Sequence, residues 1–403
     1  MNILYVGTLP PHPGGTAIVG CQLLDGLVRR GHRVTAIAPL TRETAAAADR
    51  FDFAHPGIHV TRFSVPHFET SPDLPAPVQY RKAEGEGVGI AWRRALSAAR
   101  PDVVIIGRET FAWHVPDLAK AAGVPALLIT HGGTTLTGIL KNFSADERAR
   151  ILEQFRKVDC IAAVANHLAK ALHGLGIRDV KTIQNAVDRR EFFSRPKDRA
   201  LLEQLAIRTE QPVIVHASNL KGLKRPLDIV DSAPEVLHQR PDTVYLVVGD
   251  GSGRAMMEAA CASPPLAGHF RFTGWVDHDL MPNYLNLADM VVMPSESEAL
   301  ALIYLETQAC ERVLIASDIA AAREVIHDGE TGILFRKGDV ADLTAKILGA
   351  LGDPALRAAI GARARQSAMN YDLERFVTAY EELLRELVQG GQSAANRAGP
   401  SLK

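Results

Sequence analysis

The chain has 403 residues, of which 47% are hydrophobic and 23% are charged, and its formal net charge is −1. This length exceeds what one ordinary core holds and predicts two domains of about 150–200 residues. The balanced charge argues against nucleic acid as the main partner, because it supplies no sustained basic field. No apolar run reaches the length of a membrane span.

The cysteines stand far apart in apolar or helical stretches, at Cys21, Cys160, Cys261 and Cys310. This pattern predicts reduced thiols, not a disulfide framework or a zinc site. The first residues, Met1–Gly7, lead directly into a strand, so we expect no signal peptide. Together these features predict a cytoplasmic protein, with peripheral membrane contact left open.

Short apolar runs alternate with helical patterns from one end of the chain to the other. In order, the runs are Ile3–Val6, Val34–Ala38, Val103–Ile106, Ala126–Thr130, Cys160–Val164, Val213–His216, Val244–Val248, Phe270–Thr273, Met290–Met293 and Val313–Ala316. Such alternation predicts βαβ units and parallel sheets covered by helices on both faces. We therefore expect an α/β fold of two Rossmann-like domains that face each other across a cleft.

A polar, proline-containing segment at 194–199 separates the two sets of runs. We assign residues 1–193 to an N-terminal domain, 194–211 to a linker and 212–370 to a C-terminal domain. A long helical pattern at 371–389 follows. The tail 390–403 is rich in Gly, Ser and Ala, which predicts disorder.

The first candidate loop follows the first strand and contains Gly14 and Gly15. Its glycines are wrongly spaced for the dinucleotide fingerprint. A glycine pair lets a main chain approach a ligand closely, because no Cβ is in the way; a tight turn alone is the alternative. Further on, the proline-rich stretch 64–77 is either an acceptor lid or a surface excursion.

The strand Ala126–Thr130 ends in His131, which two glycines follow. A histidine at the carboxyl end of a parallel strand lies where open α/β sheets bind ligands. A purely structural histidine is the alternative.

Three basic residues, Lys221, Lys224 and Arg225, precede Pro226, which fits the first turn of a helix. Charge-assisted bonds from such a cluster suit a diphosphate and are worth about 1.5–3 kcal/mol each. A solvated basic loop is the alternative.

Two later loops carry glycines or acidic residues after a strand. Gly249 and Gly251 again lack the dinucleotide spacing. The run 277–279, Asp-His-Asp, imitates a metal-binding motif, but it precedes a helix, where Asp is a favoured cap. We therefore predict no metal site there.

The stretch from Met290 to Glu306 predicts a strand, a turn that contains Glu298 and a helix from Leu300 to Cys310. The start of such a helix offers unpaired N–H groups and the positive end of a dipole, which together suit a phosphate. Carboxylates on both sides of a phosphate site suit a ligand that carries hydroxyls at both ends. A nucleotide sugar is such a ligand.

The spacing of Glu298 and Glu306 resembles the signature of the family 4 retaining glycosyltransferases, which have the two-domain GT-B fold. The resemblance covers nearly the whole chain and is strongest over 212–345. The second domain, opening at Ser218 with Lys224 six residues on, looks most like the branch that makes N-acetylglucosaminyl malate. The chain departs from the family by lacking an Asp at 135 and by having Ala in place of Gly at 299 and 301.

The resemblance implies transfer of a hexose, GlcNAc, glucose or similar, from a nucleoside diphosphate sugar to an acceptor hydroxyl. It implies retention, a UDP-linked donor, no metal ion and no cofactor beyond that co-substrate. It assigns catalytic roles to His131, Lys224 and Glu298, and it implies that the last long helix crosses back onto the first domain. Together with the loops above, it predicts a donor site of Gly14, Gly15, Ser218, Asn219, Lys221, Lys224, Arg225, Gly249, Gly251, Trp275, Ala299, Leu300, Ala301, Leu302 and Glu306.

Within this site, Lys224 would hold the leaving phosphate, Glu298 the sugar hydroxyls and Glu306 the ribose. Two rival functions remain open: a hydrolysing UDP-sugar 2-epimerase, and a nucleotide-sugar-binding protein that has lost catalysis. An NAD enzyme is disfavoured by both glycine spacings. The acceptor, whether a small molecule, a glycan or a lipid-linked sugar, and the oligomeric state are left open.

Overall fold

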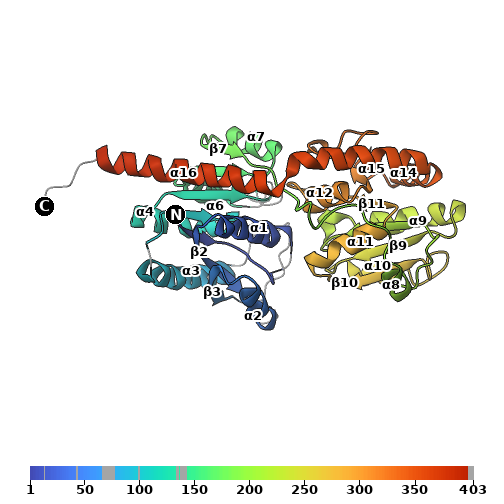
Figure 1. The fold of residues 1–403 in the computed structure, drawn as a ribbon, viewed down its shortest axis with the longest axis horizontal. Helices are drawn as coiled ribbons and strands as arrows, with labels where there is room; N and C mark the ends of the chain where they lie inside the picture. Colours follow the sequence, from blue (N-terminus) through green and yellow to red (C-terminus); the bar gives the residue numbers. More distant parts are fainter. Residues whose placement is uncertain are drawn as a thin grey trace. The chain divides into compact units, whose positions relative to one another are not determined.

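The computed structural model describes residues 1–12, 14–41, 44–65, 78–98, 100–132, 136 and 143–397. It forms two compact units (Figure 1). Unit 1 comprises Met1–Asn185 and the segment that begins at Leu373, and unit 2 comprises Ala186–Asp372. Of the proline-rich stretch 64–77, predicted as a lid or a surface excursion, residues 66–77 lie outside the described residues.

Unit 1 is built around a parallel sheet of seven strands, in the order β3-β2-β1-β4-β5-β6-β7. Its elements are β1 (Asn2–Val6), α1 (Gly15–Arg29), β2 (Arg33–Leu40), α2 (Ala45–Ala54), β3 (Ile58–Ser64), α3 (Val78–Ala98), β4 (Val103–Ile106), η1 (Glu109–Trp113), α4 (Val115–Ala122), β5 (Ala126–Thr130), α6 (Ala145–Phe155), β6 (Cys160–Ala163), α7 (Asn166–Gly174), β7 (Val180–Thr182) and α16 (Leu373–Arg397).

Unit 2 contains a second parallel sheet, of six strands, in the order β10-β9-β8-β11-β12-β13. Its elements are α8 (Arg199–Gln204), β8 (Val213–Ala217), η2 (Gly222–Lys224), α9 (Leu227–Gln239), β9 (Val244–Val248), α10 (Arg254–Ala260), β10 (Phe270–Gly274), η3 (His278–Leu280), α11 (Met281–Leu287), β11 (Met290–Met293), α12 (Leu302–Ala309), β12 (Val313–Ser317), α13 (Ala320–Arg323), β13 (Ile333–Phe335), α14 (Val340–Gly352), α15 (Pro354–Ala368) and η4 (Met369–Tyr371).

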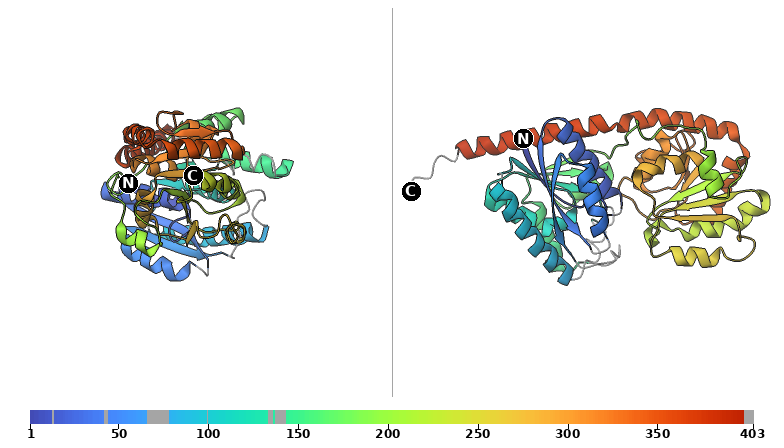
Figure 2. Two further views of the ribbon diagram at one scale, coloured as in Figure 1. Left: turned by 90° about the vertical axis from the view of Figure 1, so that its right-hand side faces the viewer. Right: turned by 60° about the horizontal axis from the view of Figure 1, so that its bottom comes forward.

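The central strands of both sheets are buried along their whole length, as the continuous apolar runs predict. Every residue of β4, β5, β8, β9, β11 and β12 is buried. In a parallel sheet the crossover helices cover both faces, so the strands are buried on both sides. Figure 2 shows each sheet between layers of helices. The predicted α/β class is therefore confirmed, and all ten predicted strands are present.

Each sheet ends in short strands that apolar periodicity does not reveal. β7 and β13 have three residues each and lie at sheet edges. No residue of β7 is buried, so its sequence carries no apolar run. Pairing with a neighbouring strand, not side-chain burial, defines it.

The last long helix packs on unit 1, as the resemblance implies. Gly26 of α1 makes close contact possible, since a Cβ there would lie 2.4 Å from Val377 of α16. Around this contact, Glu381 of α16 accepts hydrogen bonds from Arg30 at 2.9 Å and pairs with His32 at 2.9 Å. A packed backbone and an ion-pair network thus hold α16 against α1 (Figure 1).

The boundaries differ from those that composition predicts. The compact units divide at Asn185–Ala186 and at Asp372–Leu373, so the predicted linker 194–211 lies inside unit 2 and includes α8. The two chain crossings are paired, because Val187 N–H donates to the Tyr371 carbonyl at 2.9 Å. α16 also continues to Arg397, through the first half of the segment for which disorder is predicted. Of the helices in the described ranges, none is long and apolar enough to cross a membrane.

Candidate active site

An ion pair between Lys224 and Glu298 lies at the carboxyl ends of two neighbouring strands of unit 2. Lys224 ends η2, which follows β8, and Glu298 lies in the loop that follows β11; β8 and β11 are paired. Lys224 Nζ lies 2.6 Å from Glu298 Oε1 and 2.7 Å from Oε2. Loops at this edge of adjacent parallel strands converge, which brings together residues 74 positions apart.

Two further contacts fix this pair. Ser295 is fully buried, and its hydroxyl donates to Glu298 Oε1 at 2.7 Å. The Glu296 N–H donates to the Leu223 carbonyl at 2.7 Å, which ties the two loops together through the main chain. The side chain of Lys224 remains 21% exposed and that of Glu298 8%. The Lys224 side chain is therefore the more exposed member of the pair.

A buried histidine supports the loop that begins at Ser218. His216 Nδ1 lies 2.9 Å from the Val292 carbonyl, and its Nε2 lies 2.7 Å from Ser218 Oγ. Burial lowers the pKa of His216 to about 4, so the neutral ring donates through Nδ1 and accepts from the serine hydroxyl. Ser218 Oγ in turn accepts from the Leu220 N–H at 3.1 Å. The Ser218 hydroxyl thus holds the main chain of the predicted donor loop in place.

Asn219 presents an unpaired acceptor beside this network. Its Oδ1 is buried and has no hydrogen-bond partner among the described residues. An orphaned buried acceptor is costly, so a ligand donor at this position would lower the free energy of the site.

Gly249 and Gly251 let two loops of unit 2 touch. A Cβ on Gly249 would lie 1.9 Å from the Ser218 carbonyl oxygen, and one on Gly251 would lie 1.9 Å from the Asn219 carbonyl oxygen. Both glycines have positive φ, 121° and 154°. The resemblance places these glycines in the donor site; in the structure they permit the close approach of the neighbouring main chain.

The three basic residues of this loop differ in what they bind. Arg225, predicted as a helper at the phosphate, donates from Nε and Nη2 to Asp228 at 2.8 and 3.0 Å, and it lies 3.7 Å from Glu296. Its guanidinium is thus committed to the start of α9. Lys221 caps η2, and its carbonyl accepts from the Lys224 N–H at 2.8 Å.

The predicted phosphate-binding helix begins two residues later than the sequence predicts. α12 starts at Leu302, with Ala301 as its N-cap (φ −68°, ψ 126°), so Ala299 and Leu300 belong to the preceding turn. Neither alanine is among the residues with positive φ. A methyl group is therefore compatible with the backbone at both positions where the family usually has glycine.

Glu306 is 4% exposed in the middle of α12 and is bound by a histidine from a different element. His278 Nε2 lies 2.7 Å from Glu306 Oε1, and the His278 ring packs on Phe192 at a centroid distance of 5.2 Å. Desolvation opposes charge on His278, but the Glu306 carboxylate outweighs it and raises the pKa of the histidine. Trp275, predicted in the donor site, follows β10 and is 51% exposed.

In unit 1, His131 lies at the end of β5, beside the loop that follows β4. Burial, with a smaller effect of the Arg108 cation, lowers the pKa of His131 to about 3, so the ring is neutral at physiological pH. Next to it, Glu109 is 1% exposed and its Oε1 accepts from the Gly132 N–H at 2.6 Å. A buried carboxylate thus holds the main chain directly after His131.

At the start of unit 1, Gly14 is the N-cap of α1, with φ 107°, and Gly15 is the first residue of the helix. A Cβ on Gly14 would meet no described atom within 4 Å. Here glycine is required by the backbone angle, not by crowding.

The predicted site residues divide between the units. The structure brings Lys224 and Glu298 together, and it places Ser218, Asn219, Gly249 and Gly251 in touching loops. Sequence reasoning missed Glu109, His216, His278 and Ser295. The sequence carried a signal for two of these residues. His216 ends a predicted apolar run, and His278 lies in the Asp-His-Asp run that was rejected as a metal site.

Two models of known protein families match the sequence of this chain. The model described as "Glycosyltransferase Family 4" matches residues 13–191, and the one described as "Glycosyl transferases group 1" matches residues 197–367. The chain belongs to the family 4 glycosyltransferases. Its fold is therefore GT-B. The region matched by the first model lies mostly in unit 1, and the region matched by the second lies in unit 2.

Relatives of the glycosyltransferase match over nearly its full length. N-acetyl-alpha-D-glucosaminyl L-malate synthase from Bacillus anthracis is 26% identical over 390 residues, 95% of this chain and 96% of that protein. A GDP-mannose-dependent mannosyltransferase from Mycolicibacterium smegmatis is 28% identical over 377 residues, 91% and 94% of the two chains. The first of these supports the predicted branch.

Solved structures share the fold of the glycosyltransferase. Sucrose-phosphate synthase from Thermosynechococcus elongatus superposes with a TM-score of 0.81 at 17% identity, over 97% of this chain and all of that one. Anabaena HepE, solved with UDP and glucose, superposes with a TM-score of 0.79 at 18% identity, over 96% and 100%. Both likenesses confirm the GT-B fold.

Proposed function

We propose that the enzyme transfers a hexose from a UDP-linked sugar to an acceptor hydroxyl with retention of configuration, and that the transfer needs no metal ion. The observation that carries the proposal is the Lys224–Glu298 ion pair beside the start of α12. A cation, a carboxylate and a helix N-terminus in one place suit a diphosphate that is esterified to a hydroxyl-rich sugar.

The leaving diphosphate is the group that most needs stabilisation. Its departure leaves an oxocarbenium-like sugar, so transfer depends on charge stabilisation more than on a nucleophile. The Lys224 ammonium and the first N–H groups of α12 would supply that charge. Donor binding would draw Lys224 from Glu298 toward the phosphate and free a carboxylate oxygen to accept a sugar hydroxyl.

The nucleoside end would be held by groups that are already oriented. Glu306 would accept the ribose hydroxyls, with His278 fixing one of its oxygens at 2.7 Å and leaving the other available. The unpaired Oδ1 of Asn219 would accept one more donor of the ligand. In unit 1, the neutral His131 would act at the transferred sugar as an uncharged hydrogen-bond partner.

A UDP-linked donor is supported by the HepE complexes with UDP and with UDP-glucose and by the malate synthase relative, whose name specifies a glucosaminyl group. The mannosyltransferase relative uses GDP-mannose, so the base is the first point to test. Thermal unfolding with UDP-GlcNAc, UDP-glucose and GDP-mannose, each at the same concentration, compares them directly, because a ligand that binds the folded state raises Tm.

The test of catalysis is analysis of products with the best donor. We expect release of UDP in EDTA-containing buffer, slow hydrolysis without acceptor and an α-configured product from an α-configured donor. Free ManNAc from UDP-GlcNAc would instead identify a 2-epimerase. Donor binding with no release of UDP would identify a binding protein, and loss of turnover in EDTA that Mg²⁺ or Mn²⁺ restores would contradict the metal-free transfer.

A further inference from the structure

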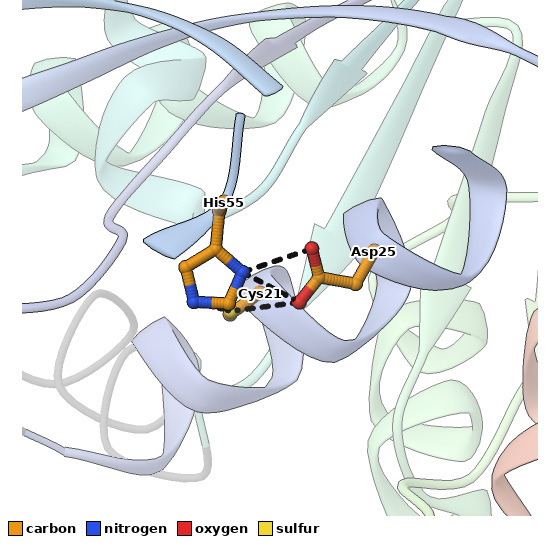
Figure 3. A group of neighbouring side chains, drawn as sticks. All are labelled: Cys21, Asp25 and His55. Carbon is orange, nitrogen blue, oxygen red and sulfur yellow. Dashed lines mark hydrogen bonds and ion pairs between the residues drawn. The ribbon is translucent and has the colours of Figure 1, made fainter. Parts of the chain in front are cut away.

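Three ligand-type side chains meet in unit 1, and none of them is among the candidate site residues described above. Cys21 and Asp25 lie one turn apart on α1, and His55 is the C-cap residue of α2 (Figure 3). Their candidate ligand atoms all lie within 4.8 Å of one another. The wide spacing of the cysteines argued against a zinc site. The structure instead brings a single cysteine together with an aspartate and a histidine from a different helix end.

The three groups converge on Asp25. His55 Nδ1 lies 3.0 Å from Asp25 Oδ1 and 2.9 Å from Oδ2, and Cys21 Sγ lies 3.5 Å from Oδ2. Around a tetrahedral Zn²⁺ with bonds of about 2.0–2.3 Å, neighbouring ligand atoms are about 3.3–3.6 Å apart. The sulfur–oxygen distance already matches, and the nitrogen–oxygen distance needs to open by about 0.4 Å. The sulfur lies 3.9 Å from the other ring nitrogen, Nε2.

The surroundings hold the histidine in place but leave the site open. The His55 ring packs on Phe51 with centroids 4.3 Å apart, and the main-chain N–H of His55 donates to the Phe51 carbonyl at 3.1 Å. Packing of this kind orients a metal-ligating imidazole. The side chains of Asp25 and His55 are each 26% exposed, which lets a metal ion enter and a water complete four-coordination.

We propose that Cys21, Asp25 and His55 bind a zinc ion in unit 1. Thiolate and imidazole favour a borderline-soft cation such as Zn²⁺ over Mg²⁺ or Ca²⁺. On binding, the Cys21 thiol loses its proton to solvent and its sulfur bonds the metal. The proton on His55 Nδ1 moves to Nε2, which frees Nδ1 to bond the metal, and one oxygen of Asp25 completes the protein ligands. The site ties α1 to α2 and supplies no group to sugar transfer.

The test uses the full chain after removal of metal with EDTA. We expect one Zn²⁺ per chain by calorimetry, with about one proton released per ion at neutral pH when buffers of different ionisation enthalpy are compared. Co²⁺ should give a sulfur-to-cobalt charge-transfer band and the visible bands of four-coordinate cobalt. Bound Zn²⁺ should also slow alkylation of Cys21 by iodoacetamide and raise Tm.

Variants separate this site from adventitious binding. Cys21→Ser and His55→Asn should each weaken Zn²⁺ binding by about 100-fold or more and abolish the cobalt charge-transfer band or change its coordination. His55→Asn keeps an amide donor near the position of Nδ1, so its hydrogen bond to Asp25 can persist and the fold be retained; unfolding in EDTA checks this. The control, His59→Ala, alters an exposed histidine of β3 and should bind as the wild type does.

The proposal is overturned if the stripped protein binds no Zn²⁺ at micromolar concentration. It is equally overturned if Cys21→Ser and His55→Asn bind Zn²⁺ with wild-type affinity, because the ion would then lie elsewhere. Neither outcome depends on sugar transfer, so the zinc site and the proposed function can fail independently.

Discussion

The candidate site residues of the two units lie in opposite electrostatic settings. In unit 2, Lys224 and Glu298 form a charged pair that remains partly exposed. In unit 1, His131 is held neutral by burial, and the buried Glu109 binds main chain instead of a cation. A charged pair suits a ligand whose charge grows during the reaction, whereas neutral groups suit hydroxyls whose charge does not. This contrast is the reason that the proposed function has the diphosphate bound by unit 2 and an uncharged part of the substrates bound by unit 1.

The largest expected effect comes from removing the cation of unit 2. Lys224→Ala should lower turnover about 10²–10³-fold, because the developing negative charge on the diphosphate loses its main partner. Lys221→Ala is the matched control in the same loop and should have a much smaller effect. Steady-state rates with the identified donor measure both, and an unchanged rate for Lys224→Ala removes that residue from the mechanism.

Removing the neutral histidine should affect transfer but not donor binding. We expect His131→Ala to lower turnover about 10²-fold while its affinity for UDP stays at the wild-type value. Calorimetry with UDP and rate measurements on the same preparation separate the two quantities. Full activity would return His131 to a structural role.

Glu306→Ala should act in the opposite way, mainly on nucleotide binding. A hydrogen bond to a charged group is worth about 1.5–3 kcal/mol, so UDP affinity should fall about 10- to 100-fold. His278→Ala, which leaves the carboxylate but removes its orienting partner, should cost less. Wild-type UDP affinity in the Glu306 variant, measured by calorimetry, would refute the ribose assignment.

Variants of Glu109 test whether its hydrogen bond to the Gly132 N–H positions His131 for transfer. Glu109→Ala leaves the Gly132 N–H without its partner at 2.6 Å, and we expect turnover to fall about 10-fold through loss of one buried hydrogen bond. Glu109→Gln can still accept that bond and should recover most of the rate. Equal losses in both variants would show that the negative charge, not the hydrogen bond, matters.

The smallest expected effect is a pH dependence of stability with opposite signs in the two units. His131 has a folded-state pKa of about 3, below its ordinary 6.5, so its contribution is lost as pH falls below 6.5. His278 has a raised pKa, so its contribution is complete below 6.5 and is lost as pH rises through the raised value.

Denaturant unfolding at pH 5 and 7.5 measures this difference. Relative to the wild type, His131→Asn should be more stable at pH 5 than at pH 7.5, and His278→Asn should be less stable at pH 5. The change for His131→Asn should be about 2 kcal/mol. Shifts of the same sign in both variants would contradict the contrast between the units.

Much of the fold was predictable from residues alone. Continuous apolar runs predict buried parallel strands, and all ten predicted runs coincide with strands. The short edge strands β7 and β13 were not predictable, because each has only three residues, too few for an apolar run, and pairing with a neighbour defines them. The unit boundary at Asn185–Ala186 was missed for a related reason: it depends on which contacts each segment makes, and composition does not encode them.

The sequence by itself determined which residue types lie at the strand ends: Lys224, Glu298 and His131 each follow a buried strand, where parallel sheets bind ligands. Only the tertiary structure decided which of them are partners. The 2.6 Å contact of Lys224 with Glu298, the contact of His278 with Glu306, and the meeting of Cys21 with His55 all join segments that are distant in sequence. Packing of strands and helices fixes such distances, and no local pattern of residues records them.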